Sequence, residues 1–120
     1  MVRIELSRKG NLRTLRLRGH ADTPPSGDAS IICAACSMLT YTLAQCVTDM
    51  AAAGLVDVDK MQLEPGDADV IYTIRAGHEA AADTSASAIL RGYELLALQY
   101  PKIFRITHAD TPEGGEKSKN

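Results

Sequence analysis

Two short segments of this chain place a histidine and a cysteine among small residues. His20 lies in Gly19-His20-Ala21, and Cys33 lies in Ile31-Ile32-Cys33-Ala34-Ala35-Cys36-Ser37. A thiolate is a strong nucleophile, and a nearby imidazole can stabilise it as an ion pair and transfer its proton. The two residue types therefore suit a Cys-His pair for acyl transfer. The alternative interpretation makes Cys33 a small buried hydrophobe and His20 a residue that only ends a strand.

The elements before Cys33 are predicted from the period of the apolar residues. Apolar and polar residues alternate from Met1 to Arg18, and Lys9-Gly10-Asn11 interrupts the alternation with residues typical of a tight turn. We therefore expect an antiparallel hairpin with strands at about 2–8 and 12–19. Residues 19–30 contain two prolines and two glycines, which predicts a long mobile loop that starts beside His20.

A long helix is predicted directly after this loop. Apolar residues recur at helical spacing over about 31–53, and Gly54 stands where a C-terminal cap belongs. Cys33 then lies in the first turn, where free N–H groups and the helix dipole favour a negative charge. We expect the backbone N–H groups of Cys33 and Ala34 to form an oxyanion hole.

The second half of the chain repeats the order of strand, strand and helix. A hairpin is expected to turn at Glu64-Pro65-Gly66-Asp67, a helix to cover about 79–100 and a last strand to cover 102–108. The predicted fold is a single α+β domain over 1–108 with the order ββαββαβ, in which two helices pack on one antiparallel or mixed sheet. Residues 109–120 are expected to form a flexible tail.

Composition narrows the classes of function. The 120 residues include 13 Lys+Arg and 15 Asp+Glu, and this nearly neutral balance argues against direct DNA binding. We find neither a signal peptide nor an apolar window of about 20 residues, and therefore expect no membrane segment. An odd number of cysteines, three, argues against a disulfide framework. We expect a cytoplasmic protein with reduced thiols.

Cys33 and Cys36 form a C-x-x-C pair, which is the spacing of redox motifs and of half a zinc site. The second half of a zinc site is absent from the sequence, so we expect no metal and no cofactor. Cys36 and Cys46 are predicted to be apolar core residues. A redox protein that uses the C-x-x-C pair is kept as an alternative.

The two motifs, with Gly27 and Asp28 between them, resemble those of the ribosomal-processing cysteine protease family, Prp, and the similarity extends over about residues 1–108. The resemblance implies a small α+β homodimer that removes the short N-terminal extension of the twenty-seventh protein of the large ribosomal subunit. It implies His20 as general base and Cys33 as nucleophile. It also implies an apolar groove beside Cys33, because the family cuts after a Phe-rich apolar stretch, and a loop that closes over the substrate.

Three supporting residues follow from the same comparison. Ser30 stands where the family has an aspartate, and we expect it to be the N-cap of the helix while Asp28 orders the loop. The alternative gives Asp28 the role of orienting His20. Ser37 lies one turn after Cys33, and its hydroxyl either reaches the site or bonds to a backbone carbonyl.

A rival function from another class is a non-catalytic homodimeric interaction module with the same fold, either ribosome-associated or phage-derived. It would keep the helices and the sheet but would not need a reactive Cys33. The protease and the interaction module differ in whether the Cys33 thiol reacts with a substrate.

Overall fold

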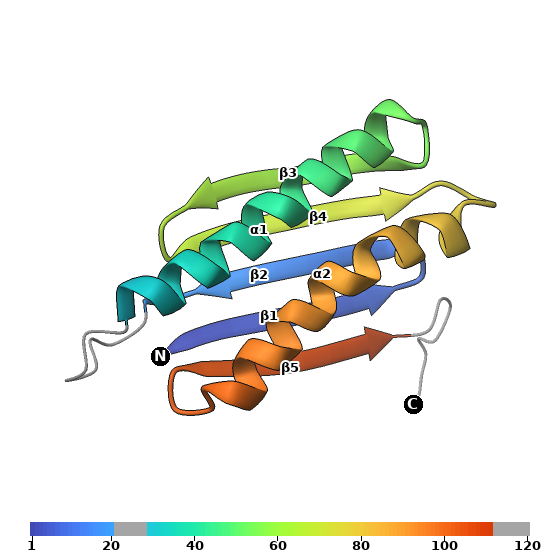
Figure 1. The fold of residues 1–120 in the computed structure, drawn as a ribbon. Helices are drawn as coiled ribbons and strands as arrows, with labels where there is room; N and C mark the ends of the chain where they lie inside the picture. The colour runs from blue at the N-terminus through green and yellow to red at the C-terminus, as the bar shows by residue number, and fades with distance from the viewer. Residues whose placement is uncertain (21–28, 112–120) are drawn as a thin grey trace.

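The computed structural model describes residues 1–20 and 29–111 of the chain (Figure 1). Its elements are β1 (Val2–Lys9), β2 (Leu12–Arg18), α1 (Ala29–Ala52), β3 (Val56–Glu64), β4 (Asp67–Ile74), α2 (Glu79–Gln99) and β5 (Phe104–Thr111). The predicted α+β class and the order ββαββαβ are confirmed. Residues 21–28 of the predicted loop, Asp28 among them, lie outside the described residues.

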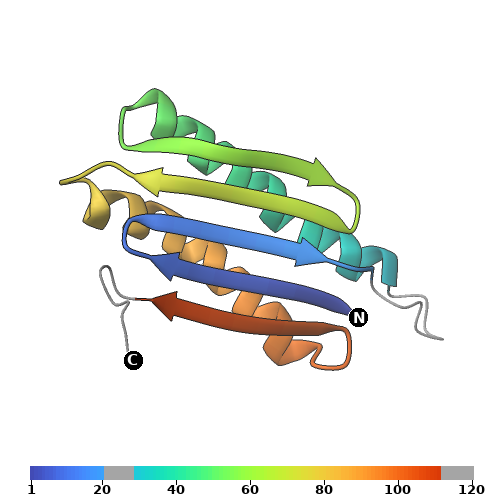
Figure 2. The ribbon, with the colours of Figure 1, turned by 180° about the vertical axis from the view of Figure 1, so that it is seen from behind.

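The five strands form one mixed sheet in the order β3-β4-β2-β1-β5. Among the described strands, β1 and β5 pair in parallel, and the β1–β2, β2–β4 and β3–β4 pairs are antiparallel. Both helices lie on one face of the sheet, and Figure 2 shows the opposite face, which no described element covers. β2 is the central strand, so each end of β2 has a neighbouring strand on both sides.

Strand alternation decides which side chains meet the helices. Leu15 of β2 is opposite Leu6 of β1 on one side and Val70 of β4 on the other, and all three side chains are buried. Because successive side chains of a strand point to opposite faces, the intervening residues point away from the helices. The helix-facing residues form one hydrophobic core with α1 and α2.

A buried hydrogen-bond chain joins the two helices. The Tyr93 hydroxyl of α2 donates to Thr40 Oγ1 at 2.8 Å, and the Thr40 hydroxyl donates to the Cys36 carbonyl oxygen at 2.9 Å. The helices also approach closely at Gly92, where an added Cβ would lie 2.6 Å from Leu39 Cδ2. These contacts hold the half of α1 that carries Cys33 against α2.

Helix α1 corrects one expectation about the composition of the chain. Its segment Ile31–Ala52, 22 residues with a mean hydropathy of 1.5, is long and apolar enough to cross a membrane by length and composition. The expectation that no such window exists is therefore wrong. The helix packs on the sheet through Leu43, Val47 and Met50, and the core helix of a soluble protein meets the same criterion, so this is weak evidence for a membrane span.

Two predicted boundaries also differ from the structure. Helix α1 begins at Ala29, two residues earlier than expected. Strand β5 continues to Thr111, so residues 109–111 belong to the sheet and not to a tail, because Ser7, Arg8 and Lys9 of β1 continue the parallel pairing with them. The remainder of the predicted tail, 112–120, lies outside the described residues.

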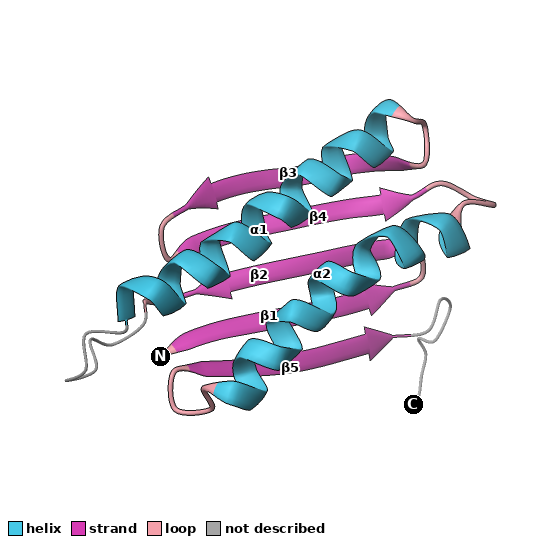
Figure 3. Cartoon of the chain, viewed as in Figure 1, coloured by secondary structure: helices cyan, strands magenta, loops and turns pink. Residues whose placement is uncertain are grey.

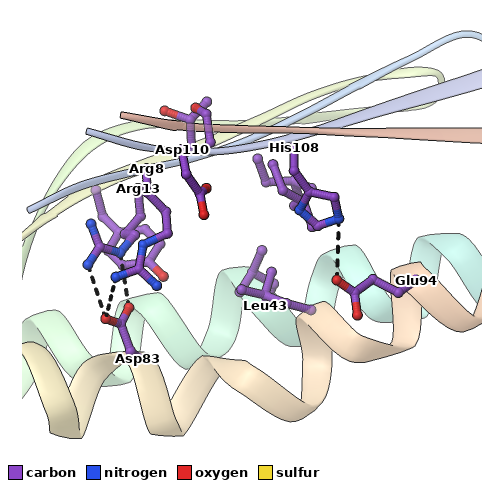
Figure 4. A pocket seen from close by; sticks show the side chains of 13 residues that line it. Arg8, Arg13, Leu43, Asp83, Glu94, His108 and Asp110 are labelled. Carbon is purple, nitrogen blue, oxygen red and sulfur yellow. Dashed lines mark hydrogen bonds and ion pairs between the residues drawn. The ribbon is translucent and has the colours of Figure 1, made fainter. Parts of the chain in front are cut away.

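Arg13 is a charged residue of the first hairpin whose side chain is buried. Alternation along β2 places Arg13 on the helix-facing side, where its Nε and Nη2 atoms each lie 3.0 Å from an oxygen of Asp83 on α2. This ion pair borders a cavity of about 220 Å³ between α2 and the sheet, where His108 also faces Glu94 at 3.3 Å (Figure 4). Neutralisation by Asp83 explains how the arginine is tolerated there.

On the open face of the sheet, Asp69 of β4 is only 1% exposed. It lies beneath Lys60 and Arg18, whose Nζ and Nη2 atoms are 2.7 and 2.9 Å from its carboxylate oxygens, and Arg16 Nε lies 3.7 Å away. Burial alone would raise the pKa of Asp69, but the hydrogen bonds from Lys60 and Arg18 outweigh burial and lower it.

We predict that Asp69→Asn lowers the free energy of unfolding at pH 7 by about 1–3 kcal/mol, because the cations lose a charged acceptor. A lowered folded-state pKa stabilises the protein above the unfolded-state value and not below it, so the difference should shrink as the pH falls below about 4. Urea unfolding at several pH values measures both effects. Asp57→Asn, which breaks an exposed pair with Arg75, is the control and should cost less. An equal effect of both changes would contradict the prediction.

Candidate active site

The backbone that leads to His20 is held by two close contacts. The Gly19 N–H donates to the Gly66 carbonyl oxygen at 2.9 Å, and the amino group of Met1 donates to the His20 carbonyl oxygen at 3.0 Å. Gly19 has a φ of +101°, and an added Cβ would lie 2.4 Å from the Met1 carbonyl oxygen. Both the backbone conformation and the available space therefore require glycine before His20.

The His20 side chain is exposed and lies against Gly66, in the turn between β3 and β4. This turn is the predicted Glu64-Pro65-Gly66-Asp67 turn. It meets the end of β2 because Arg18 is paired with Asp67 in the sheet. His20 follows the end of β2, and this end of β2 and the β3–β4 turn lie at the end of the molecule where α1 begins (Figure 3).

Cys33 is half-buried and is the fifth residue of α1. In an α-helix that begins at Ala29, the N–H groups of Cys33 and Ala34 donate to carbonyls of the preceding turn. The oxyanion hole predicted from these two N–H groups is therefore wrong, because the helix starts earlier than expected. The free N–H groups at the start of α1 precede Cys33, which lies one turn inside the helix.

A small pocket of about 90 Å³ lies between α1 and the β3–β4 turn, and neither His20 nor Cys33 is among its lining residues. Its lining includes Gly66, which lies against the His20 ring, and Cys36 and Ser37, one turn beyond Cys33. The pocket is lined by Leu17, Cys36, Ser37, Thr40, Tyr41, Leu63, Glu64, Pro65, Gly66 and Ala68. Among the residues described, no hydrogen bond or ion pair joins the His20 and Cys33 side chains.

The supporting residues have different outcomes. Helix α1 begins at Ala29, one residue before Ser30, and the capping role of the Ser30 side chain stays a prediction. Asp28 lies outside the described residues. Ala34 is exposed on α1. Ser37 is exposed beside the pocket, and within the described part of the chain its hydroxyl makes no hydrogen bond, in contrast to the backbone bond that is usual for a helical serine.

The other two cysteines differ from Cys33 in their surroundings. Cys36 belongs to the core, and burial, followed by the proximity of Cys33, raises its pKa to about 11. Burial also raises the pKa of Cys46, with a smaller contribution from Asp49. Both groups are thus protonated at neutral pH and are poor nucleophiles or exchange partners. Over residues 1–20 and 29–111, no group of three His, Cys, Asp or Glu side chains could hold a metal ion.

Sequence reasoning did not identify the pocket residues from the β3–β4 turn. Pro65 and Gly66 were recognised as turn residues, but nothing in their spacing relates them to His20. Tyr41 of α1 also lines the pocket, and its side chain is 55% exposed. Only the pairing of β2 with β4 brings these segments together.

The comparisons with known proteins agree with the motifs. The family model described as Cysteine protease Prp matches residues 1–105. No curated protein matches the chain.

Solved structures share the fold. The protein SMU.848 from Streptococcus mutans has a TM-score of 0.66 at 22% identity, over 92% of this chain and 99% of that chain. Prp from S. aureus, described as an essential ribosomal processing protease, has a TM-score of 0.63 in complexes with a substrate peptide and with a covalently linked product peptide, at 15% and 18% identity. Both of these matches cover 90% of this chain and 99% of that chain. The match of the family model over nearly the whole chain shows that it belongs to the cysteine protease Prp family.

Proposed function

We propose that this protein is a cysteine endopeptidase in which Cys33 is the nucleophile and His20 is the general base. The observation that carries the proposal is the pocket between α1 and the β3–β4 turn, whose lining includes Gly66, which lies against the His20 ring, and Cys36 and Ser37, in the helical turn after Cys33. The burial of Cys36 and the raised pKa of Cys46 leave Cys33 as the thiol suited to this role.

The proposed reaction proceeds in two steps. His20 accepts the proton of Cys33, and the thiolate attacks the carbonyl carbon of the scissile bond to form a tetrahedral intermediate. The intermediate collapses to a thioester as the imidazolium donates its proton to the leaving amine. His20 then accepts a proton from water, the resulting hydroxide attacks the thioester, and the new acid and the Cys33 thiol are released. The positive end of α1, one turn before Cys33, favours the negative charge in both steps.

The proposed substrate is the N-terminal extension of a large-subunit ribosomal protein, the twenty-seventh. An apolar side chain next to the cut suits the pocket, whose lining includes Leu17, Leu63 and Ala68. S. aureus Prp forms a complex with a covalently linked product peptide. From that complex we extend to this chain only the formation of a covalent bond with the peptide. The proposal places the protein in the cytoplasm, where its thiols stay reduced.

We also propose that the protein acts as a homodimer. The large apolar side chains exposed on the helices include Ile31, Met38, Leu95 and Leu98. Met38 and Leu95 are 64% and 56% exposed and border one groove between α1 and α2. Apolar surface of this kind is stabilised by contact with a second copy.

We predict that Cys33→Ala lowers the cleavage rate of a peptide carrying the ribosomal extension by at least about a thousandfold, because the thioester cannot form. His20→Ala should also lower the cleavage rate strongly. The rates are measured by chromatography of the products. Cys46→Ala is the matched control and should stay within about twofold of wild type. Wild-type activity in Cys33→Ala would favour the non-catalytic interaction module.

We predict that Leu98→Glu, which places a charge at a side chain 78% exposed, weakens the dimer. Sedimentation velocity over a concentration series measures the dissociation constant, and we expect it to rise by about tenfold or more. Arg75→Glu, at an exposed position before α2, is the control. A wild-type protein that stays monomeric at high concentration would contradict the proposed dimer.

A further inference from the structure

The His20 ring rests on the backbone of a turn that is remote in sequence. A Cβ added to Gly66 would lie 2.4 Å from His20 Cε1, 2.5 Å from Nε2 and 2.9 Å from Nδ1. All three separations are below 3.0 Å, a distance that real Cβ atoms essentially never reach. Any side chain with a Cβ at position 66 would therefore force the imidazole to move.

The same glycine also holds the backbone next to His20. Its carbonyl oxygen accepts the Gly19 N–H at 2.9 Å. Gly66 thus lies against the ring and also accepts a hydrogen bond from the residue that precedes His20. Gly66 also lines the pocket, together with Cys36 and Ser37. The residue that supports the ring is therefore also part of the pocket.

We propose that Gly66 is a positioning residue for His20: its bare Cα supports the imidazole in the orientation that serves Cys33. This inference rests on the proposed function, in which His20 is the general base. General base catalysis depends on geometry, and a displacement of about 1 Å can cost about a hundredfold in rate. A methyl group at position 66 produces a displacement of that kind.

A merely structural role would also explain the glycine, because its φ of +71° disfavours other residues. The chain offers two matched controls for this role. Gly54 and Gly77 have φ values of +80° and +89°, and an added Cβ at either position would meet nothing within 4 Å. Alanine at all three positions meets the same backbone strain, but only Gly66→Ala meets the ring.

The test compares Gly66→Ala with Gly54→Ala and Gly77→Ala in the full chain. Melting temperature reports the backbone strain, kcat on the ribosomal-extension peptide reports catalysis, and NMR of 13C-labelled histidine rings reports the position of the His20 imidazole. We expect similar losses of melting temperature in the three variants. Only Gly66→Ala should shift the His20 ring signals and lower kcat by about tenfold to a hundredfold, while the controls stay within about twofold.

A second variant separates strain from contact. Asparagine tolerates a positive φ, so Gly66→Asn keeps the turn but still places a Cβ under the ring, and Gly54→Asn is its control. We expect Gly66→Asn to fold, to shift the ring signals and to lose kcat as Gly66→Ala does. This variant also serves if Gly66→Ala does not fold.

Two results would overturn the inference: wild-type ring signals in Gly66→Asn, or a shift of those signals with unchanged kcat while His20→Ala is inactive. Failure of the proposed function looks different. In that case His20→Ala cleaves normally, and the positioning role in catalysis fails with it, although the ring signals of Gly66→Asn still move.

Discussion

The hydrogen bond between the Gly19 N–H and the Gly66 carbonyl oxygen ties the end of the central strand to the β3–β4 turn. β2 lies between β1 and β4, so its end is fixed from both sides before the chain leaves the sheet. His20 is the next residue. The position of His20 therefore depends on the pairing of the strands in the sheet.

The position of the thiol depends on how α1 is held over the same end of the sheet. The chain from the Tyr93 hydroxyl through Thr40 to the Cys36 carbonyl fixes the turn that follows Cys33. Core residues of α1 then pack on the helix-facing side of the strands. The end of the sheet at the β3–β4 turn and the first half of α1 thus lie on either side of one pocket. A site on such elements is held more tightly than one built on loops alone.

Local pattern was sufficient to predict most of the fold. The alternation in the hairpins, the helical spacing of the apolar residues and the turn residues Gly10 and Gly66 all correspond to observed elements. The motifs around His20 and Cys33 were also visible in the sequence. These features depend on residues that are close together in the chain, so a single sequence reveals them.

Features that depend on distant contacts were missed. The burial of Arg13 requires Asp83, 70 positions away, and the support of His20 requires Gly66 from another hairpin. The side chains did not indicate that α1 starts at Ala29. Because of this early start, the N–H groups of Cys33 and Ala34, which were expected to be oxyanion donors, lie inside the helix. In each case the missing information was the strand order or a helix boundary, which periodicity does not determine.

The central claim is that the Cys33 sulfur becomes covalently bonded to the substrate with the help of His20. A chloromethyl ketone of the peptide that precedes the cut, followed by digestion and mass spectrometry, tests it directly. We predict a single thioether adduct on Cys33 that forms far more slowly in His20→Ala. An adduct on Cys36 or Cys46, or no adduct at concentrations that block cleavage, would contradict the claim.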